Sequence, residues 1–97
     1  MRKLEKGEWF ILIIYDITND RRRDRFAECL NGYGYRVQKS CFEAILSRSL
    51  YRKLLDEIPK YLDKSEDSVR VYRFGENSRV TKYGIVENAD YEIVGII

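Results

Sequence analysis

The segment WFILIIYDITNDRRRDR, residues 9–25, decides the fold. Its first part, residues 9–15, is apolar and rich in isoleucine and aromatics, which is typical of a β-strand and too short for a stable helix. This run lacks the apolar–polar alternation of a strand with one solvated face, so we expect both of its faces to be covered. The run ends at a single acid, Asp16, which we expect to be partly desolvated, and four arginines follow between Arg21 and Arg25.

A helix is expected after this strand, over about 20–31. Thr18 or Asn19 can cap its first turn, because short polar side chains accept hydrogen bonds from the N–H groups there. Gly32 and Gly34 can end it. The apolar residues at helical spacing, which should be buried, are Phe26, Ala27, Leu30 and Tyr33.

Residues 35–46 predict either one strand with a break or two short strands in sequence. A second helix should follow, capped by Ser47 or Ser49. Pro59 lies inside its apolar stripe and should kink the helix or end it early. The stripe itself consists of Leu50, Leu54, Ile58, Tyr61 and Leu62.

Residues 68–75 alternate strictly and predict another strand, and residues 83–97 should supply two more short strands around the turn at residues 88–90. This order is typical of an α+β, ferredoxin-like (βαββαβ) sandwich with an extra C-terminal strand. Such a domain places both helices on one face of the sheet. A second copy packed face to face, as a homodimer, would cover the other face of the first strand.

The composition predicts one folded domain over residues 1–97, because 44% hydrophobic and 35% charged residues suit a globular chain. The net charge of +2 is too balanced to indicate nucleic acid by itself. The apolar run is too short to span a bilayer, and residues 1–8 are charged rather than signal-like, so we expect a cytoplasmic protein without membrane contact. Cys29 and Cys41 lack metal-ligand spacing and should be free thiols.

The chain contains no histidine, which excludes Ser–His and Cys–His nucleophile systems and histidine-rich zinc sites. Asp16 is therefore the candidate ligand for Mg²⁺ or Mn²⁺, since Mg²⁺ prefers oxygen ligands and often takes only one or two carboxylates. A two-fold axis would bring two copies of Asp16 together. The alternative is that Asp16 pairs with an arginine of the following helix or caps that helix. At least one arginine of residues 21–25 should contact phosphate, which guanidinium binds in a two-point geometry.

Two stretches carry a resemblance to a known family. IIYDITNDRRRDR, residues 13–25, and GYGYRVQKSCFE, residues 32–43, resemble the small CRISPR-associated family that partners the integrase in spacer acquisition, the second family in the Cas numbering. The shared pattern is a strand ending in Tyr-Asp-Ile, an acidic or amide pair, an arginine-bearing helix and then Arg-x-Gln-x-Ser-x-Phe. Length and element order also fit, so the resemblance covers essentially the whole chain.

The resemblance implies a ferredoxin-like homodimer with a metal-dependent nuclease activity on RNA or DNA. Asp16 would be the divalent-metal ligand at the dimer axis. The other positions linked to activity or site architecture are Tyr15, Arg23, Arg25, Arg36, Ser40 and Phe42. The arginine-rich start of the helix leaves open which arginine is the functional one. For Tyr15 a place in the core is the alternative, and for Phe42 it is packing on the sheet face at the dimer interface.

Two functions remain open. The first is a Mg²⁺-dependent endonuclease or endoribonuclease that cuts double-stranded DNA or single-stranded RNA. The second is a non-catalytic scaffold that binds duplex DNA by its backbone and holds the CRISPR integrase. One clear metal ligand in each chain argues against strong catalysis, and arginines without a base-reading element suit backbone binding. We interpret the chain as a scaffold with a formal nuclease activity, and we expect the acidic, apolar segment of residues 87–97 to dock the integrase and to add to the dimer.

Overall fold

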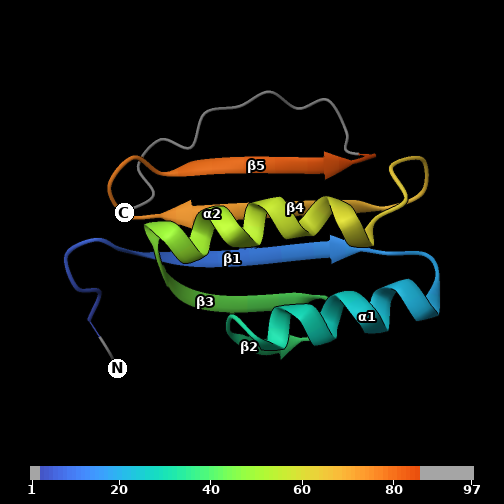
Figure 1. Cartoon of the computed structure of the whole chain (residues 1–97), viewed down its shortest axis with the longest axis horizontal. Coiled ribbons are helices and arrows are strands. Elements are labelled where there is room, and N and C mark those ends of the chain that lie inside the picture. The colour runs from blue at the N-terminus through green and yellow to red at the C-terminus, as the bar shows by residue number, and fades with distance from the viewer. Residues whose placement is uncertain (1–2, 86–97) are drawn as a thin grey trace.

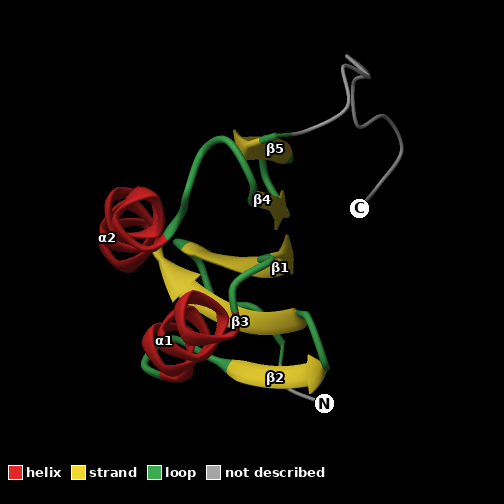
Figure 2. Ribbon diagram, turned by 90° about the vertical axis from the view of Figure 1, so that its right-hand side faces the viewer, coloured by secondary structure: helices red, strands yellow, loops and turns green. Residues whose placement is uncertain are grey.

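The computed structural model describes residues 3–85 of the chain. These residues form a five-stranded sheet with both α-helices on one face, which leaves the other face open (Figures 1 and 2). The elements, in chain order, are β1 (Glu8–Asp16), α1 (Asp20–Asn31), β2 (Tyr35–Gln38), β3 (Cys41–Ser47), α2 (Arg48–Glu57), the 3₁₀ helix η1 (Ile58–Tyr61), β4 (Ser68–Phe74) and β5 (Arg79–Gly84).

The strands lie in the order β2-β3-β1-β4-β5, and every neighbouring pair is antiparallel. This is the ferredoxin-like arrangement with one strand added beside β4, so the predicted fold class is confirmed. The added strand begins at Arg79, earlier than the predicted start at Tyr83. The expected turn at residues 88–90 and the strand after it lie outside the described residues.

The central strand β1 has two apolar faces with different surroundings. Ile11, Ile13 and Tyr15 point toward the helices and are buried. Leu12 and Ile14 point to the open face, where Ile14 remains 42% exposed. Within residues 3–85, the prediction that both faces are covered therefore holds for only one face.

Helix α1 forms where the sequence predicted it, because its signals are local. Asn19 is the N-cap, and its Oδ1 accepts a hydrogen bond from the N–H of Arg22 at 2.9 Å. Gly32 is the C-cap. Gly34 also bonds the end of the helix, since its N–H donates to the carbonyl oxygen of Leu30 at 3.1 Å, and a Cβ there would lie 2.1 Å from the carbonyl oxygen of Glu43. A glycine at this position lets β2 start close beside β3.

Helix α2 is capped by Ser47, whose Oγ accepts from the N–H of Leu50 at 3.3 Å. The helix ends at Glu57, and Pro59 lies in η1, so the predicted early end is confirmed. The prediction that Leu50 is buried is wrong, since it is 45% exposed. Tyr51, Leu54 and Ile58 share the buried face. Leu50 lies in the exposed first turn of the helix, about 100° around the helix axis from its neighbour Tyr51.

A single hydrophobic core lies between the helices and the sheet. It contains the predicted residues Phe26, Ala27 and Leu30 of α1 together with Val69 and Val71 of β4. Within residues 3–85, none of the helices is both long and apolar enough to cross a membrane.

Candidate metal and nucleic-acid site

Asp16 is the last residue of β1 and lies on the open face of the sheet, paired in register with Ser68 of β4. It borders a shallow hollow of about 270 Å³ that Arg70 and Tyr72 also line. Its side chain is exposed, so the prediction of partial desolvation is wrong for the single chain. The reason is that nothing in the described part of one chain covers this end of the open face.

Neither alternative role of Asp16 is found in the structure. The cap of α1 is Asn19, and Arg23 bonds elsewhere, donating to the carbonyl oxygen of Ile17 and to the carboxylate of Asp20. Across residues 3–85, the Asp16 carboxylate has no ion pair and no hydrogen bond. Its oxygens are therefore free for an external ligand.

The chemistry of this position fits a weakly held divalent cation. An exposed carboxylate with free oxygens suits Mg²⁺, which keeps several of its waters when it binds protein. Among the described residues, no three acidic, cysteine or histidine side chains are close enough together to hold a metal ion. Within residues 3–85, Asp16 is thus a single ligand and not a complete metal site.

The arginines at the start of α1 have different surroundings. Arg22 is held by two carboxylates, with Nε 3.0 Å from Oδ2 of Asp67 and Nη2 2.8 Å from Oε2 of Glu66. Arg25 is exposed, and its guanidinium lies 5.9 Å from the centre of the Tyr61 ring. Of the two predicted arginines, Arg25 therefore has the freer guanidinium, since Arg23 is bonded to backbone and side chain near its own helix turn.

Asp67 is the one buried charged residue in the described chain, and it joins three segments. Its carboxylate accepts hydrogen bonds from the N–H of Thr18 at 3.1 Å, from the N–H of Asp63 at 2.9 Å and from Arg22. Burial disfavours the charged form of this carboxylate, but these hydrogen bonds outweigh burial, so the pKa of Asp67 lies below its usual value. We call Asp67, Arg22 and Thr18 the acid latch.

Tyr15, Arg36 and Phe42 meet on the helix side of the sheet, opposite to Asp16. Tyr15 and Phe42 are core residues, with 3% and 1% of their surface exposed. The guanidinium of Arg36 lies 5.7 Å from the Phe42 ring centre, and its Nη2 donates to the Tyr15 hydroxyl at 3.4 Å. Because β1 alternates, Tyr15 and its neighbour Asp16 point to opposite faces.

Ser40 lies in the turn between β2 and β3, one residue before β3 begins at Cys41. Its carbonyl oxygen accepts from the N–H of Tyr15 at 3.1 Å. Phe42 faces the helices, and it therefore does not pack on the open face where a face-to-face partner would lie. Arg36, Ser40 and Phe42 support Tyr15 in the core, and their predicted link to activity remains a prediction.

Sequence reasoning did not identify Asp67 and Glu66 as partners of an arginine. The only sequence signal for them is a group of acids in residues 63–67, directly before the strand predicted at residue 68. It could not indicate which arginine they bind, because Arg22 and Asp67 are 45 residues apart in the sequence.

Comparisons with known proteins were made on the sequence and on the fold. Residues 9–82 match the family described as CRISPR associated protein Cas2. The chain is 42% identical over 78 residues to the "CRISPR-associated endoribonuclease Cas2" of Mycobacterium tuberculosis, covering 80% of this chain and 68% of that protein. It is also 42% identical over 78 residues to a Chloroflexus aurantiacus protein of the same description, covering 78% and 84%.

Solved structures with the same fold were found as well. A Thermus thermophilus protein described as hypothetical has a TM-score of 0.68 at 34% identity and covers 82% of this chain and 98% of its own. Cas2 of Streptococcus pyogenes has a TM-score of 0.63 at 27% identity and covers 70% and 88%.

Proposed function

Because this chain belongs to the CRISPR-associated Cas2 family, we propose that it is a metal-dependent endonuclease of CRISPR adaptation that works as a homodimer on RNA or double-stranded DNA. The observation that carries this proposal is Asp16, an exposed carboxylate without an internal partner in residues 3–85, at the end of the central strand. Relatives named endoribonucleases support the nuclease class.

The homodimer follows from the open face of the sheet. Phe10, Leu12 and Ile14 project from it beside Tyr72 and Phe74 of β4. An apolar sheet face of this kind needs a partner, and a second copy would supply one. If the two-fold axis passes near the end of β1, both copies of Asp16 meet there and form one site.

Light scattering should give twice the 11.6 kDa mass of one chain at micromolar concentration. Ile14→Glu, which puts a charge on the proposed interface, should shift the protein to the single-chain mass. Leu50→Glu is the matched control, because Leu50 is an equally exposed apolar residue on α2, on the helix side. A single-chain mass for the wild type would contradict the homodimer.

When bound, Mg²⁺ or Mn²⁺ would polarise the phosphodiester and lower the pKa of a coordinated water. In this proposal the carboxylate oxygens of Asp16 would hold the ion, and the exposed guanidinium of Arg25 would hold a phosphate in two-point geometry. With no histidine in the chain, acid–base work on the leaving group falls to solvent or to the few polar groups near Asp16. We therefore expect a slow nuclease.

Cleavage of a labelled single-stranded RNA and of a labelled DNA duplex tests this proposal. Activity should appear with Mg²⁺ or Mn²⁺, disappear with a chelator and return when the metal is restored. Activity that persists in chelator would contradict metal dependence, and its absence with both metals and both substrates would favour the scaffold.

The scaffold is the second candidate function, in which the dimer binds duplex DNA by its backbone and positions the integrase. The freedom of the Arg25 guanidinium and the exposed start of α1 favour it. The acidic segment of residues 87–97, expected to dock the integrase, lies outside the described residues. Deleting Glu92–Ile97 and testing capture of the integrase beside dimer mass would separate docking from dimerisation.

Backbone binding makes a prediction about salt. Duplex affinity should fall with rising salt, and Arg25→Gln should reduce the log–log slope by about 0.9, the value for one phosphate contact on B-DNA. The loss should be the same for unrelated sequences, since phosphate contacts carry no sequence information. Lys53→Gln, an equal change of charge on the exposed side of α2, should leave the slope unchanged. An unchanged slope for Arg25→Gln would remove this arginine from the proposed interface.

A further inference from the structure

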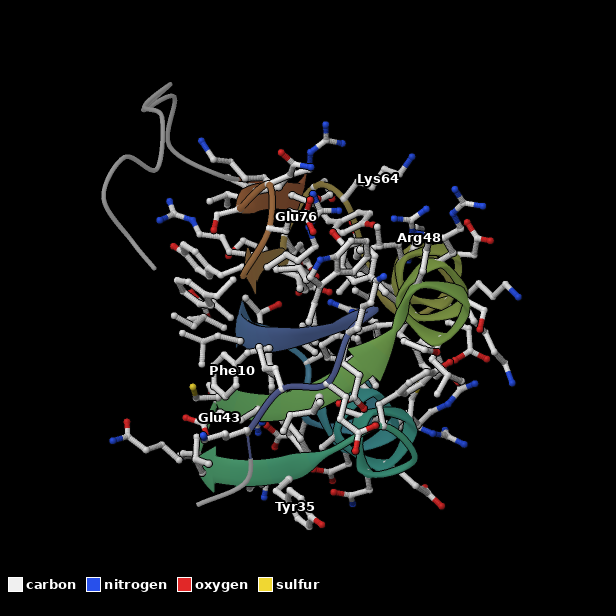
Figure 3. All side chains as sticks on the ribbon, turned by 90° about the vertical axis from the view of Figure 1, so that its left-hand side faces the viewer. Phe10, Tyr35, Glu43, Arg48, Lys64 and Glu76 are labelled. Carbon is white, nitrogen blue, oxygen red and sulfur yellow. The ribbon has the colours of Figure 1, made fainter. Side chains whose placement is uncertain are left out.

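A second hollow, of about 370 Å³, lies at the end of β1 opposite to Asp16. It is formed by the start of β1, the start of α2 and the ends of β4 and β5 at their shared turn, and Figure 3 looks onto this end of the molecule, with Arg48 and Glu76 labelled. Its lining includes two aromatic residues and four arginines: Trp9, Tyr51, Arg48, Arg52, Arg73 and Arg79. We call it the arginine pocket.

The charges of the arginine pocket are uncompensated. No acidic residue lines it, and none of its four arginines forms an ion pair with any residue between 3 and 85. Arg22 on α1 is different, because its carboxylate partners are in contact with it. Gathering like charges without counter-charges is unfavourable, and an anion from outside would relieve the repulsion.

Stacking on the aromatic rings fixes two of these guanidinium groups. Arg73 lies 4.1 Å from the centre of the Trp9 ring and 5.4 Å from that of Tyr51. Arg48 lies 5.6 Å from the Trp9 ring centre. Nη2 of Arg73 also donates to the carbonyl oxygen of Asn77. A guanidinium stacked on a ring presents its remaining N–H donors at its edge, and this suits binding of phosphate oxygens.

Two buried donors in the arginine pocket have no partner among the described residues. They are the hydroxyl of Tyr51, a residue only 4% exposed, and Nε of Arg73. A buried polar group without a hydrogen bond costs free energy, and an acceptor oxygen that reached either group would remove that cost. This observation is independent of the arginine charges and points to the same ligand chemistry.

We propose that the arginine pocket binds a single phosphate group, either free or at the end of a nucleic-acid strand. Its volume lies in the range of small-ligand sites, roughly 300–1,000 Å³. Helix α2 begins at Arg48, so the positive end of its dipole adds to the field there. The adjoining hollow is of mixed charge, with Glu5, Glu8 and Glu76 beside Lys6 and Arg48, so it is less suited to a second phosphate.

The proposal is independent of the metal site. Trp9 and Asp16 lie near opposite ends of β1, and the arginine pocket is on the helix side whereas Asp16 is on the open face. Asp16→Asn should therefore leave phosphate binding unchanged, and a failure of the nuclease proposal would not touch this one.

Titration calorimetry with inorganic phosphate, and with one short oligonucleotide carrying a 5′-phosphate or a 5′-hydroxyl, tests the proposal. The double change Arg48→Gln and Arg79→Gln should weaken phosphate binding at least tenfold, because each removes a charge-assisted donor. The double change Lys60→Gln and Lys64→Gln alters net charge equally at exposed positions outside the pocket, and it should weaken binding less than twofold.

Tyr51→Phe separates binding from folding. It removes only the unpartnered hydroxyl, so phosphate affinity should fall roughly tenfold while the melting temperature does not fall. Tighter binding of the 5′-phosphate oligonucleotide than of the 5′-hydroxyl one would identify the end of a strand as the ligand. Equal affinity for the two oligonucleotides, together with binding of inorganic phosphate, would identify the free anion as the ligand. Absence of phosphate binding by the wild type, or equal weakening by the arginine and lysine pairs, would overturn the proposal.

Discussion

Asp16→Asn should reduce metal-dependent cleavage by at least about 100-fold, since loss of a metal's charge stabilisation amounts to several kcal/mol and each 1.36 kcal/mol is tenfold in rate. The change keeps the size of the side chain and removes its charge. In the proposed dimer it removes both carboxylates of the shared site at once. Calorimetric binding of Mn²⁺ should be lost together with activity.

Folding should be unaffected by this change, which makes the activity result interpretable. Asp16 is exposed and has no internal partner within residues 3–85, so the melting temperature of Asp16→Asn should match the wild type. Asp56→Asn is the matched control, because Asp56 is an exposed acid on α2. Cleavage by Asp16→Asn at the wild-type rate would rule out the site.

Asp67→Ala should have the largest effect on stability, a loss of about 3–5 kcal/mol, because the buried carboxylate accepts from two backbone N–H groups and a guanidinium, and losing each such bond costs about 1–3 kcal/mol. The N–H groups of Thr18 and Asp63 would lose their acceptor, and Arg22 would keep only Glu66. For a chain of this size, the melting temperature should fall by roughly 12 °C or more. Glu66→Ala is the control, because Glu66 is exposed and shares the same arginine, and it should cost under about 1 kcal/mol.

The acid latch also predicts a pH dependence. Because the pKa of Asp67 is lowered in the folded protein, its contribution is complete above the unfolded value of about 3.9. It is lost as pH falls below that value and through the lower folded pKa. The free energy of unfolding of the wild type, measured with denaturant, should therefore fall in this acid range. The free energy of unfolding of Asp67→Asn should depend less on pH there. Equal profiles would show that another acid is responsible.

The sequence predicted the elements whose signals are local. The apolar run of β1, the Asn19 cap and the stripe of Phe26, Ala27 and Leu30 each lie within a few residues of one another, and each took the predicted form. The prediction for Leu50 was wrong because the spacing of apolar residues does not show which residue at the edge of a helix face is buried. Its neighbour Tyr51 is the residue of α2 that packs against Trp9, at 5.2 Å between ring centres.

The candidate site was predictable in its central residue and not in its surroundings. Asp16 stands out because an acid ends an apolar run. The partners of Arg22 and the members of the arginine pocket come from segments far apart in the chain, and only the folded sheet brings them together. Sequence periodicity could show which face a residue takes, but not which distant residue meets it.

The acid latch has a consequence for how variation in this family is to be read. Arg22 and Asp67 depend on each other, so chains that diverge from this one should keep both or replace both. If related chains retain an arginine at position 22, the reason would then be its role in folding, although Arg22 lies among arginines that suit nucleic-acid binding. Arg25, which lacks such a partner within residues 3–85, is the position whose evolutionary history should follow the ligand.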